Sequence, residues 1–237
     1  PNNKDSLRNY FSQATLIDDG IGRILQKLRT LNMLENTIVI YTSDHGFSLG
    51  NHGIWGHGMA AWPSSIHRPS FNIPLIFSGP SIIKGVSETF VSQLDLANTL
   101  LDLAGAEKLK GHRVDSKTLD LSDLNSQNRK MLFMEQEESR AIRNERWLYI
   151  ERFNKEALSD LGSELYDLKE DPDERNNLSH SVSHKNTISS LSKELSQYYD
   201  KFSDPKFNLW AGGSAKSNVS NPSFWKKAWG SKWKTTI

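Results

Sequence analysis

An acidic residue and a histidine stand side by side just after a short apolar run. Asp44 and His45 follow Ile38-Val39-Ile40, a pattern typical of a buried strand. Ligands and metals in open α/β sheets bind beyond the carboxyl ends of strands. A carboxylate oxygen and a neutral imidazole nitrogen both suit a divalent cation. The pair could instead form an Asx-type turn with a solvated histidine.

The segment from residue 46 to residue 72 carries four more residues that could do chemistry. It is rich in Gly, His and aromatic residues, and a loop of this length inside a compact domain is usually functional. The four residues are His52, His57, His67 and Arg68. A histidine can donate to an oxyanion when charged or move a proton when neutral, and an arginine suits carboxylates and other oxyanions.

Each of these residues also has a structural interpretation. His52 could make a hydrogen bond that stabilises the loop. His57 could pack on Trp55 or Trp62, and His67 with Arg68 could be a solvated pair.

The order of the motifs resembles that of the sulfatase family, within the alkaline phosphatase superfamily. Sulfatases typically show Ser-Asp-His-Gly or Ser-Asp-Asn-Gly after a strand, then Gly-Glu-His-Gly, Trp-x-Lys and a Pro-Leu-Ile strand. This chain has Ser43-Asp44-His45-Gly46, Gly50-Asn51-His52-Gly53, Trp55-Gly56-His57 and Pro74-Leu75-Ile76. The segments Leu16 to Leu25, Leu34 to Val39, Gln93 to Leu101 and Glu164 to Leu168 also match. Several linked motifs are far more specific than any one of them.

The resemblance implies roles for these residues. Asp44 and His45 would bind Ca²⁺, although an imidazole is less typical of Ca²⁺, so His45 could instead contact the nucleophile or the sulfate. His57 stands where the family has a lysine that binds a sulfate oxygen. His52 is a second catalytic candidate. His67 and Arg68 would bind substrate, with arginine suited to a carboxylate or a second sulfate.

One family motif is absent from the chain. Sulfatases carry a Cys/Ser-x-Pro-x-Arg segment whose Cys or Ser becomes formylglycine, the nucleophile. This chain has no Cys and no Ser-x-Pro-x-Arg, and the paired aspartates that open a sulfatase sequence are also missing. We therefore expect the C-terminal portion of a sulfatase, with an N-terminal portion that supplies the formylglycine and the other Ca²⁺ ligands.

The predicted fold class is α/β: part of a largely parallel mixed sheet flanked by helices, followed by a small antiparallel sheet-plus-helix subdomain. Helices are expected at residues 6–31, 92–104 and 184–202, the first ending near Asn32 and the second at Gly105. Buried strands are expected at 37–42 and 73–78. Shorter strands are expected at 131–134, 140–143, 147–152 and 164–168, with a hairpin turn at Asn144-Glu145-Arg146.

Three regions are expected along the chain: 1–125 from the catalytic domain, 126–205 as the small subdomain, and 206–237 as a tail rich in Trp and Lys. The tail carries Trp210, Trp225, Trp229 and Trp233. It could be a flap that faces the substrate. We favour an arm packed on the N-terminal portion or on a second subunit, because exposed Trp is costly.

Composition narrows the function classes. The 29 basic and 28 acidic residues give a net charge of +1, which predicts no nucleic-acid partner. No apolar run is long enough for a membrane span. We expect a sulfuric ester hydrolase that desulfates a sulfated carbohydrate or polysaccharide and is secreted, periplasmic or lysosomal. A phosphoester or phosphonate hydrolase with an unmodified Thr or Ser nucleophile, and a non-catalytic sulfatase-like binding protein, are alternatives.

Overall fold

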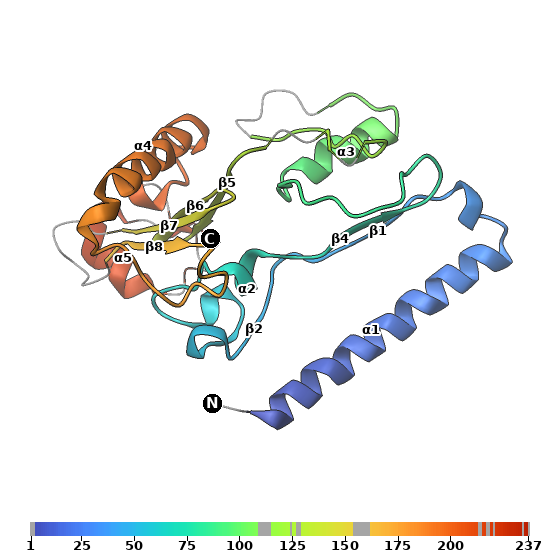
Figure 1. Cartoon of the computed structure of the whole chain (residues 1–237), viewed down its shortest axis with the longest axis horizontal. Helices are drawn as coiled ribbons and strands as arrows, with labels where there is room; N and C mark the ends of the chain where they lie inside the picture. The colour runs from blue at the N-terminus through green and yellow to red at the C-terminus, as the bar shows by residue number, and fades with distance from the viewer. Residues whose placement is uncertain are drawn as a thin grey trace.

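The computed structural model describes residues 3–108, 115–123, 125–126, 129–153, 162–212, 215–216, 219, 221–233 and 235–236. One part of it is built on a long helix and a pair of strands, and the other on a four-stranded sheet (Figure 1). The chain contains both helices and strands, as the α/β prediction requires, with four consecutive strands among the described residues between 132 and 167.

The first helix, α1 (Lys4–Thr30), begins where the side chain of Asn3 accepts a hydrogen bond from the Ser6 N–H. It ends before Asn32, whose φ of 53° is the left-handed conformation expected there. The helix runs back along one side of the chain in Figure 1, and its Tyr10 ring lies 5.3 Å from that of Phe47. Its apolar face is partly open, since Leu16 and Ile17 are 70% and 55% exposed whereas Ile21 and Leu25 are half-buried.

Strands β1 (Val39–Thr42) and β4 (Leu75–Ser78) pair antiparallel, with Tyr41 opposite Ile76. The parallel character predicted for this sheet is therefore not confirmed by its described strands. The prediction that both strands are buried was wrong for this chain, because Tyr41 is 40% exposed and Ile76 56% exposed. The physical reason is that only one face of the pair is partly covered: Ile40, Thr42, Leu75 and Phe77 are half-buried, whereas Tyr41 and Ile76 point to the other face.

The segment between β1 and β4, which the sequence predicts as a long loop, contains short strands and a short helix. It contains the short hairpin of β2 (Ser48–Leu49) and β3 (Trp55–Gly56), and the one-turn helix α2 (Arg68–Phe71). After β4, α3 (Asp95–Leu103) ends at Gly105, whose φ of +64° favours glycine.

The predicted small antiparallel sheet is confirmed. Its strands run in the order β5-β6-β7-β8, each antiparallel to the next, with bounds Leu132–Gln136, Ser139–Arg143, Trp147–Arg152 and Glu164–Asp167. Residues 144–146 form the expected turn between β6 and β7. Helix α4 (Lys185–Phe202) packs on one face through Leu191, Leu195 and Tyr199.

The other face of this sheet holds the segment that carries the predicted site residues. Ile66 is 1% exposed and packs on Ala141, Leu148 and Ile150. Burying one large aliphatic side chain contributes about 1.5–3 kcal/mol. The sheet is therefore the platform that holds residues 64–71 in place.

The tail packs on the end of β7 of its own chain, and both sequence interpretations of its role stay predictions. It comprises β9 (Ala215–Lys216), α5 (Pro222–Trp229) and β10 (Thr235–Thr236), with β9 and β10 parallel. Trp225 is fully buried against Phe153 at the end of β7, and Trp210, Trp229 and Trp233 surround them. Helical periodicity explains the pattern, since it puts the indole of Trp225 inside and leaves Lys226 and Lys227 exposed.

Within the described residues, no helix combines the length and the apolar character that crossing a membrane requires. The region boundaries near residues 125 and 205 stay predictions.

Candidate active site

A cleft of about 760 Å³ lies where the two parts of the chain meet, and three of the predicted site residues line it. Asp44 and His45 reach it from the end of β1, and His57 from the turn after β3. The opposite wall comes from β5 and the end of α4 and includes Phe133, Glu135, Gln136, Tyr198 and Phe202. Asp44, His45 and His57 lie within 13 positions of one another in the sequence. The residues of the opposite wall lie more than 70 positions further along the chain.

Asp44 is placed by the turn that follows β1. Its Oδ1 accepts hydrogen bonds from the His45 backbone N–H at 2.9 Å and the Ser43 hydroxyl at 3.4 Å. The backbone N–H of His45, and then the charge of its imidazole, lower the pKa of the Asp44 carboxyl. The carboxylate is exposed, so Asp44 presents a negatively charged oxygen, Oδ2, to the cleft.

His45 has a defined tautomer when neutral. Its Nδ1 lies 2.8 Å from the Gly46 carbonyl oxygen, which can only accept, so Nδ1 carries the hydrogen. The lone pair is therefore on Nε2, which lies 3.8 Å from Asp44 Oδ2. Gly46 is required here because a Cβ at this position would lie 2.0 Å from the Pro69 carbonyl oxygen.

The donor set of Asp44 and His45 fits a divalent cation. Cation–oxygen distances for Ca²⁺ are about 2.3–2.6 Å, so two donor atoms 3.8 Å apart can share one ion. Ca²⁺ takes about six to eight ligands. These two side chains would therefore be part of a larger ligand set.

His57 presents an N–H to the same cleft. Its Nδ1 accepts a hydrogen bond from the Met59 backbone N–H at 3.2 Å, so in the neutral ring the hydrogen is on Nε2. Its ring centroid lies 5.1 Å from that of His45. His57 can thus donate to an anion without first gaining a proton.

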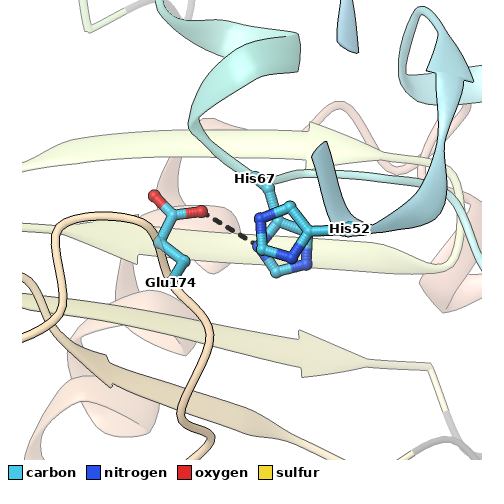
Figure 2. Close-up of side chains that lie close together, drawn as sticks. All are labelled: His52, His67 and Glu174. Carbon is cyan, nitrogen blue, oxygen red and sulfur yellow. Dashed lines mark hydrogen bonds and ion pairs between the residues drawn. The ribbon is translucent and has the colours of Figure 1, made fainter. Parts of the chain in front are cut away.

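His52 and His67 do not line this cleft. They form a second cluster with Glu174 (Figure 2), in which the two imidazole rings stack with centroids 3.9 Å apart and planes 10° apart. His67 Nδ1 lies 3.0 Å from Glu174 Oε2, and the Arg68 backbone N–H donates to the same oxygen at 3.0 Å. His67 is only 7% exposed, whereas the Arg68 side chain is exposed. Burial and then the charge of His67 lower the pKa of His52.

Sequence reasoning missed the buried network that supports this loop. Arg152 is buried and donates to Glu164 Oε1 at 3.1 Å, to the Ser64 carbonyl at 2.8 Å and to the Ser139 hydroxyl. The Tyr166 hydroxyl donates to Glu164 Oε2 at 2.7 Å. Burial, and then its hydrogen bond to Glu164, raise the pKa of Tyr166. The sequence did contain one signal for this network: Arg152 and Glu164 are charged residues within segments predicted as strands.

Comparisons with known proteins identify relatives of this chain. A family model described as Sulfatase matches residues 1–106, and one described as N-sulphoglucosamine sulphohydrolase, C-terminal, matches residues 57–201. The chain is 29% identical over 219 residues to the N-acetylglucosamine-6-O-sulfatase of Bacteroides thetaiotaomicron, covering 84% of this chain and 37% of that protein. It is 28% identical over 249 residues to arylsulfatase K of Bos taurus, covering 93% of this chain and 43% of that protein.

A solved structure shares the fold. It is a protein in complex with its substrate D-glucosamine-2-N,6-O-disulfate, with a TM-score of 0.70 and 27% sequence identity. The match covers 84% of this chain and 41% of that protein. The chain thus spans about two fifths of the length of these relatives.

Proposed function

Because the chain belongs to the sulfatase family, we propose that the intact protein hydrolyses sulfate esters of a sulfated carbohydrate. The observation that carries the proposal is the cleft shared by Asp44, His45 and His57. There a carboxylate and an imidazole lone pair face one cation position, and an imidazole N–H stands beside them.

In this proposal, Asp44 Oδ2 and His45 Nε2 hold a divalent cation, which the family resemblance identifies as Ca²⁺. When bound, such a cation supplies positive charge that polarises the sulfate oxygens. His57 Nε2–H donates to a sulfate oxygen and stabilises the charge that develops on it. The formylglycine nucleophile and the remaining cation ligands would come from an N-terminal portion of the same protein.

The far wall of the cleft supports a carbohydrate substrate. Phe133 and Tyr198 stack with ring centroids 3.8 Å apart, and Phe202 packs on Tyr198. Aromatic faces suit the apolar faces of sugar rings, and the polar ends of Glu135 and Gln136 beside them can bind hydroxyl groups. The names of two relatives, a 6-O-sulfatase and a protein bound to a disulfated glucosamine, support the same substrate class.

The geometry supports the other predicted site residues unequally. The side chain of Arg68 is exposed, so we propose that it contacts a carboxylate or second sulfate of the substrate. The imidazole of His67 is buried between Glu174 and Glu164, which leaves it no surface for a sugar. We likewise assign no catalytic step to His52, whose ring stacks on His67. A secreted, periplasmic or lysosomal location is proposed because sulfated glycans occur there.

The test compares kcat/KM of the intact protein on a sulfated disaccharide, an aryl sulfate and a phosphonate monoester. We expect the sulfated disaccharide to be the best substrate. A preference for the aryl sulfate would contradict a carbohydrate substrate, and a preference for the phosphonate would favour the phosphoester alternative. Tight binding of sulfated sugars without turnover would indicate a binding protein.

Replacing His57 with alanine should lower kcat by about 100-fold, because removing one hydrogen-bond donor to a developing oxyanion typically costs that much. Lysine, the residue expected from the family pattern, also donates, so His57→Lys should keep most of the activity. The measurement is kcat on a saturating sulfated sugar. His180→Ala, which alters an exposed histidine outside the cleft, is the control. An H57A enzyme of normal kcat would remove His57 from the mechanism.

A further inference from the structure

We propose that His52, His67 and Glu174 form a second metal site, which binds Zn²⁺. One ligand atom from each of the three side chains lies within 4.8 Å of the other two. Two imidazole nitrogens and one carboxylate oxygen, with water in the fourth position, are a ligand set that tetrahedral Zn²⁺ accepts. The site draws on three segments: the β2–β3 hairpin, the start of α2 and the turn after β8.

The carboxylate of this cluster is held in place. Glu174 is 1% exposed and has a φ of 57°, an uncommon backbone conformation for a residue other than glycine. Its Oε2 faces His67 Nδ1, and its Oε1 has no hydrogen-bond partner. A buried carboxylate oxygen without a partner is costly, so Glu174 has capacity to bind a cation.

The surroundings of His67 match those of a metal-bound histidine. Glu164 Oε2 lies 3.6 Å from His67 Nε2, on the side of the ring opposite Glu174. Metal-bound histidines usually donate their second ring N–H to such a carboxylate. Binding would move the His67 hydrogen from Nδ1 to Nε2, so that Nδ1 bonds the metal and Nε2–H donates to Glu164. No proton leaves a neutral His67 in this exchange.

The ring of His52 must turn when the ion binds. The lone pairs of two stacked rings lie in nearly parallel planes, here with ring centroids 3.9 Å apart, so the two histidines cannot both direct a lone pair at one ion in the stacked arrangement. His52 is the exposed member of the cluster, whereas His67 and Glu174 are fixed by burial (Figure 2). The proposed site therefore has two ligands fixed by burial, His67 and Glu174, and a third ligand, His52, whose ring turns toward the ion.

The ligand types select the ion. Carboxylates as well as arginines act on this cluster: Glu174, Glu164 and Arg175 on His52, and Glu174 and Arg68 on Arg143. Ca²⁺ and Mg²⁺ bind through oxygen ligands, whereas two of the three ligands here are imidazole nitrogens. Zn²⁺ gains additional bonding to imidazole nitrogen, which makes it the ion that this site would retain.

The test uses the intact protein, stripped with a chelator and then titrated with Zn²⁺ in a calorimeter. Saturating Ca²⁺ is kept present so that Asp44 and His45 are occupied. We expect one Zn²⁺ per chain. His52→Ala should weaken Zn²⁺ binding by at least about tenfold, because removing even a group that only hydrogen-bonds to a metal ligand costs that much. His52 is exposed, so this variant should fold. Glu174→Gln is the second variant, and His180→Ala is the matched control.

Cobalt gives an independent signal, because Co²⁺ in a tetrahedral site absorbs visible light strongly. The wild-type and H180A proteins should develop this absorption, and the H52A protein should not. The proposal is overturned if Zn²⁺ binding is the same in wild type, H52A and E174Q. It is also overturned if Zn²⁺ binding disappears only in Asp44→Asn, which would place the ion in the cleft.

Discussion

Replacing Asp44 with asparagine is expected to lower kcat/KM of the intact protein on a sulfated sugar by about a thousandfold or more. Asparagine keeps the shape and can still accept the His45 backbone N–H through Oδ1, so the loop should stay folded. What is lost is the negative charge at Oδ2, the atom that faces His45 Nε2 across the cation position. Losing a cation that stabilises transition-state charge typically costs this much.

The measurement pairs kinetics with a Ca²⁺ titration of the chelator-treated protein. The D44N protein should need far more Ca²⁺ for half-maximal activity, which separates a metal effect from a folding effect. Asp18→Asn is the matched control, because Asp18 is an exposed carboxylate on α1 and does not line the cleft. Wild-type kinetics and Ca²⁺ dependence in D44N would mean that Asp44 is not a metal ligand.

Replacing Arg152 with methionine should lower the free energy of unfolding by about 3–5 kcal/mol, the usual cost of removing one partner from a buried ion pair. The Arg152 side chain is 4% exposed. It holds the Ser64 carbonyl, the Ser139 hydroxyl and the Glu164 carboxylate together. Methionine fills much of the same volume and makes none of these hydrogen bonds. Two carboxylates would lose their arginine partner: Glu138, which is fully buried 3.7 Å from Arg152, and the partly buried Glu164.

Arg146→Met is the control for the loss of an arginine as such. Arg146 pairs with Asp167 on the same sheet, but its side chain is 55% exposed, so solvent screens the pair and the loss should be much smaller. Denaturant unfolding of both variants gives the comparison. Equal losses would show that the buried network does not anchor the loop that carries Ile66 and His67.

The sequence predicted the cleft residues because their chemistry is local. Asp44 and His45 directly follow a strand, and His57 lies 12 residues after His45 in a motif pattern of fixed order. The antiparallel subdomain was also predictable, since each of its strands has a clear run of strand-forming residues and Asn144 to Arg146 forms a turn.

The second cluster could not be predicted because its contacts are distant in sequence. His67 and Glu174 are 107 residues apart. Glu174 follows the acidic stretch from Asp167 to Asp173, whose composition is typical of a solvated turn, and no periodicity indicates that its side chain is buried. Only the fold brings Glu174 beside the start of α2, where its carboxylate pairs with the buried imidazole of His67.

The exposure of β1 and β4 was missed for a related reason. An apolar run indicates which side chains a strand can bury, but Tyr41 and Ile76 lie opposite each other on a face of the strand pair that stays exposed. Burial depends on the covering element as much as on the strand itself.

The packing of the tail gives the protein an optical signal of its own. Four of its seven Trp residues, at positions 210, 225, 229 and 233, gather around Phe153. The rings of Trp225 and Trp233 lie nearly parallel, with centroids 6.2 Å apart. Docking buries Trp225 completely and the other three indoles in part, so the emission of these four residues depends on whether the tail is docked at the end of β7. Intrinsic fluorescence therefore reports on the strand that carries Arg152, without any attached dye.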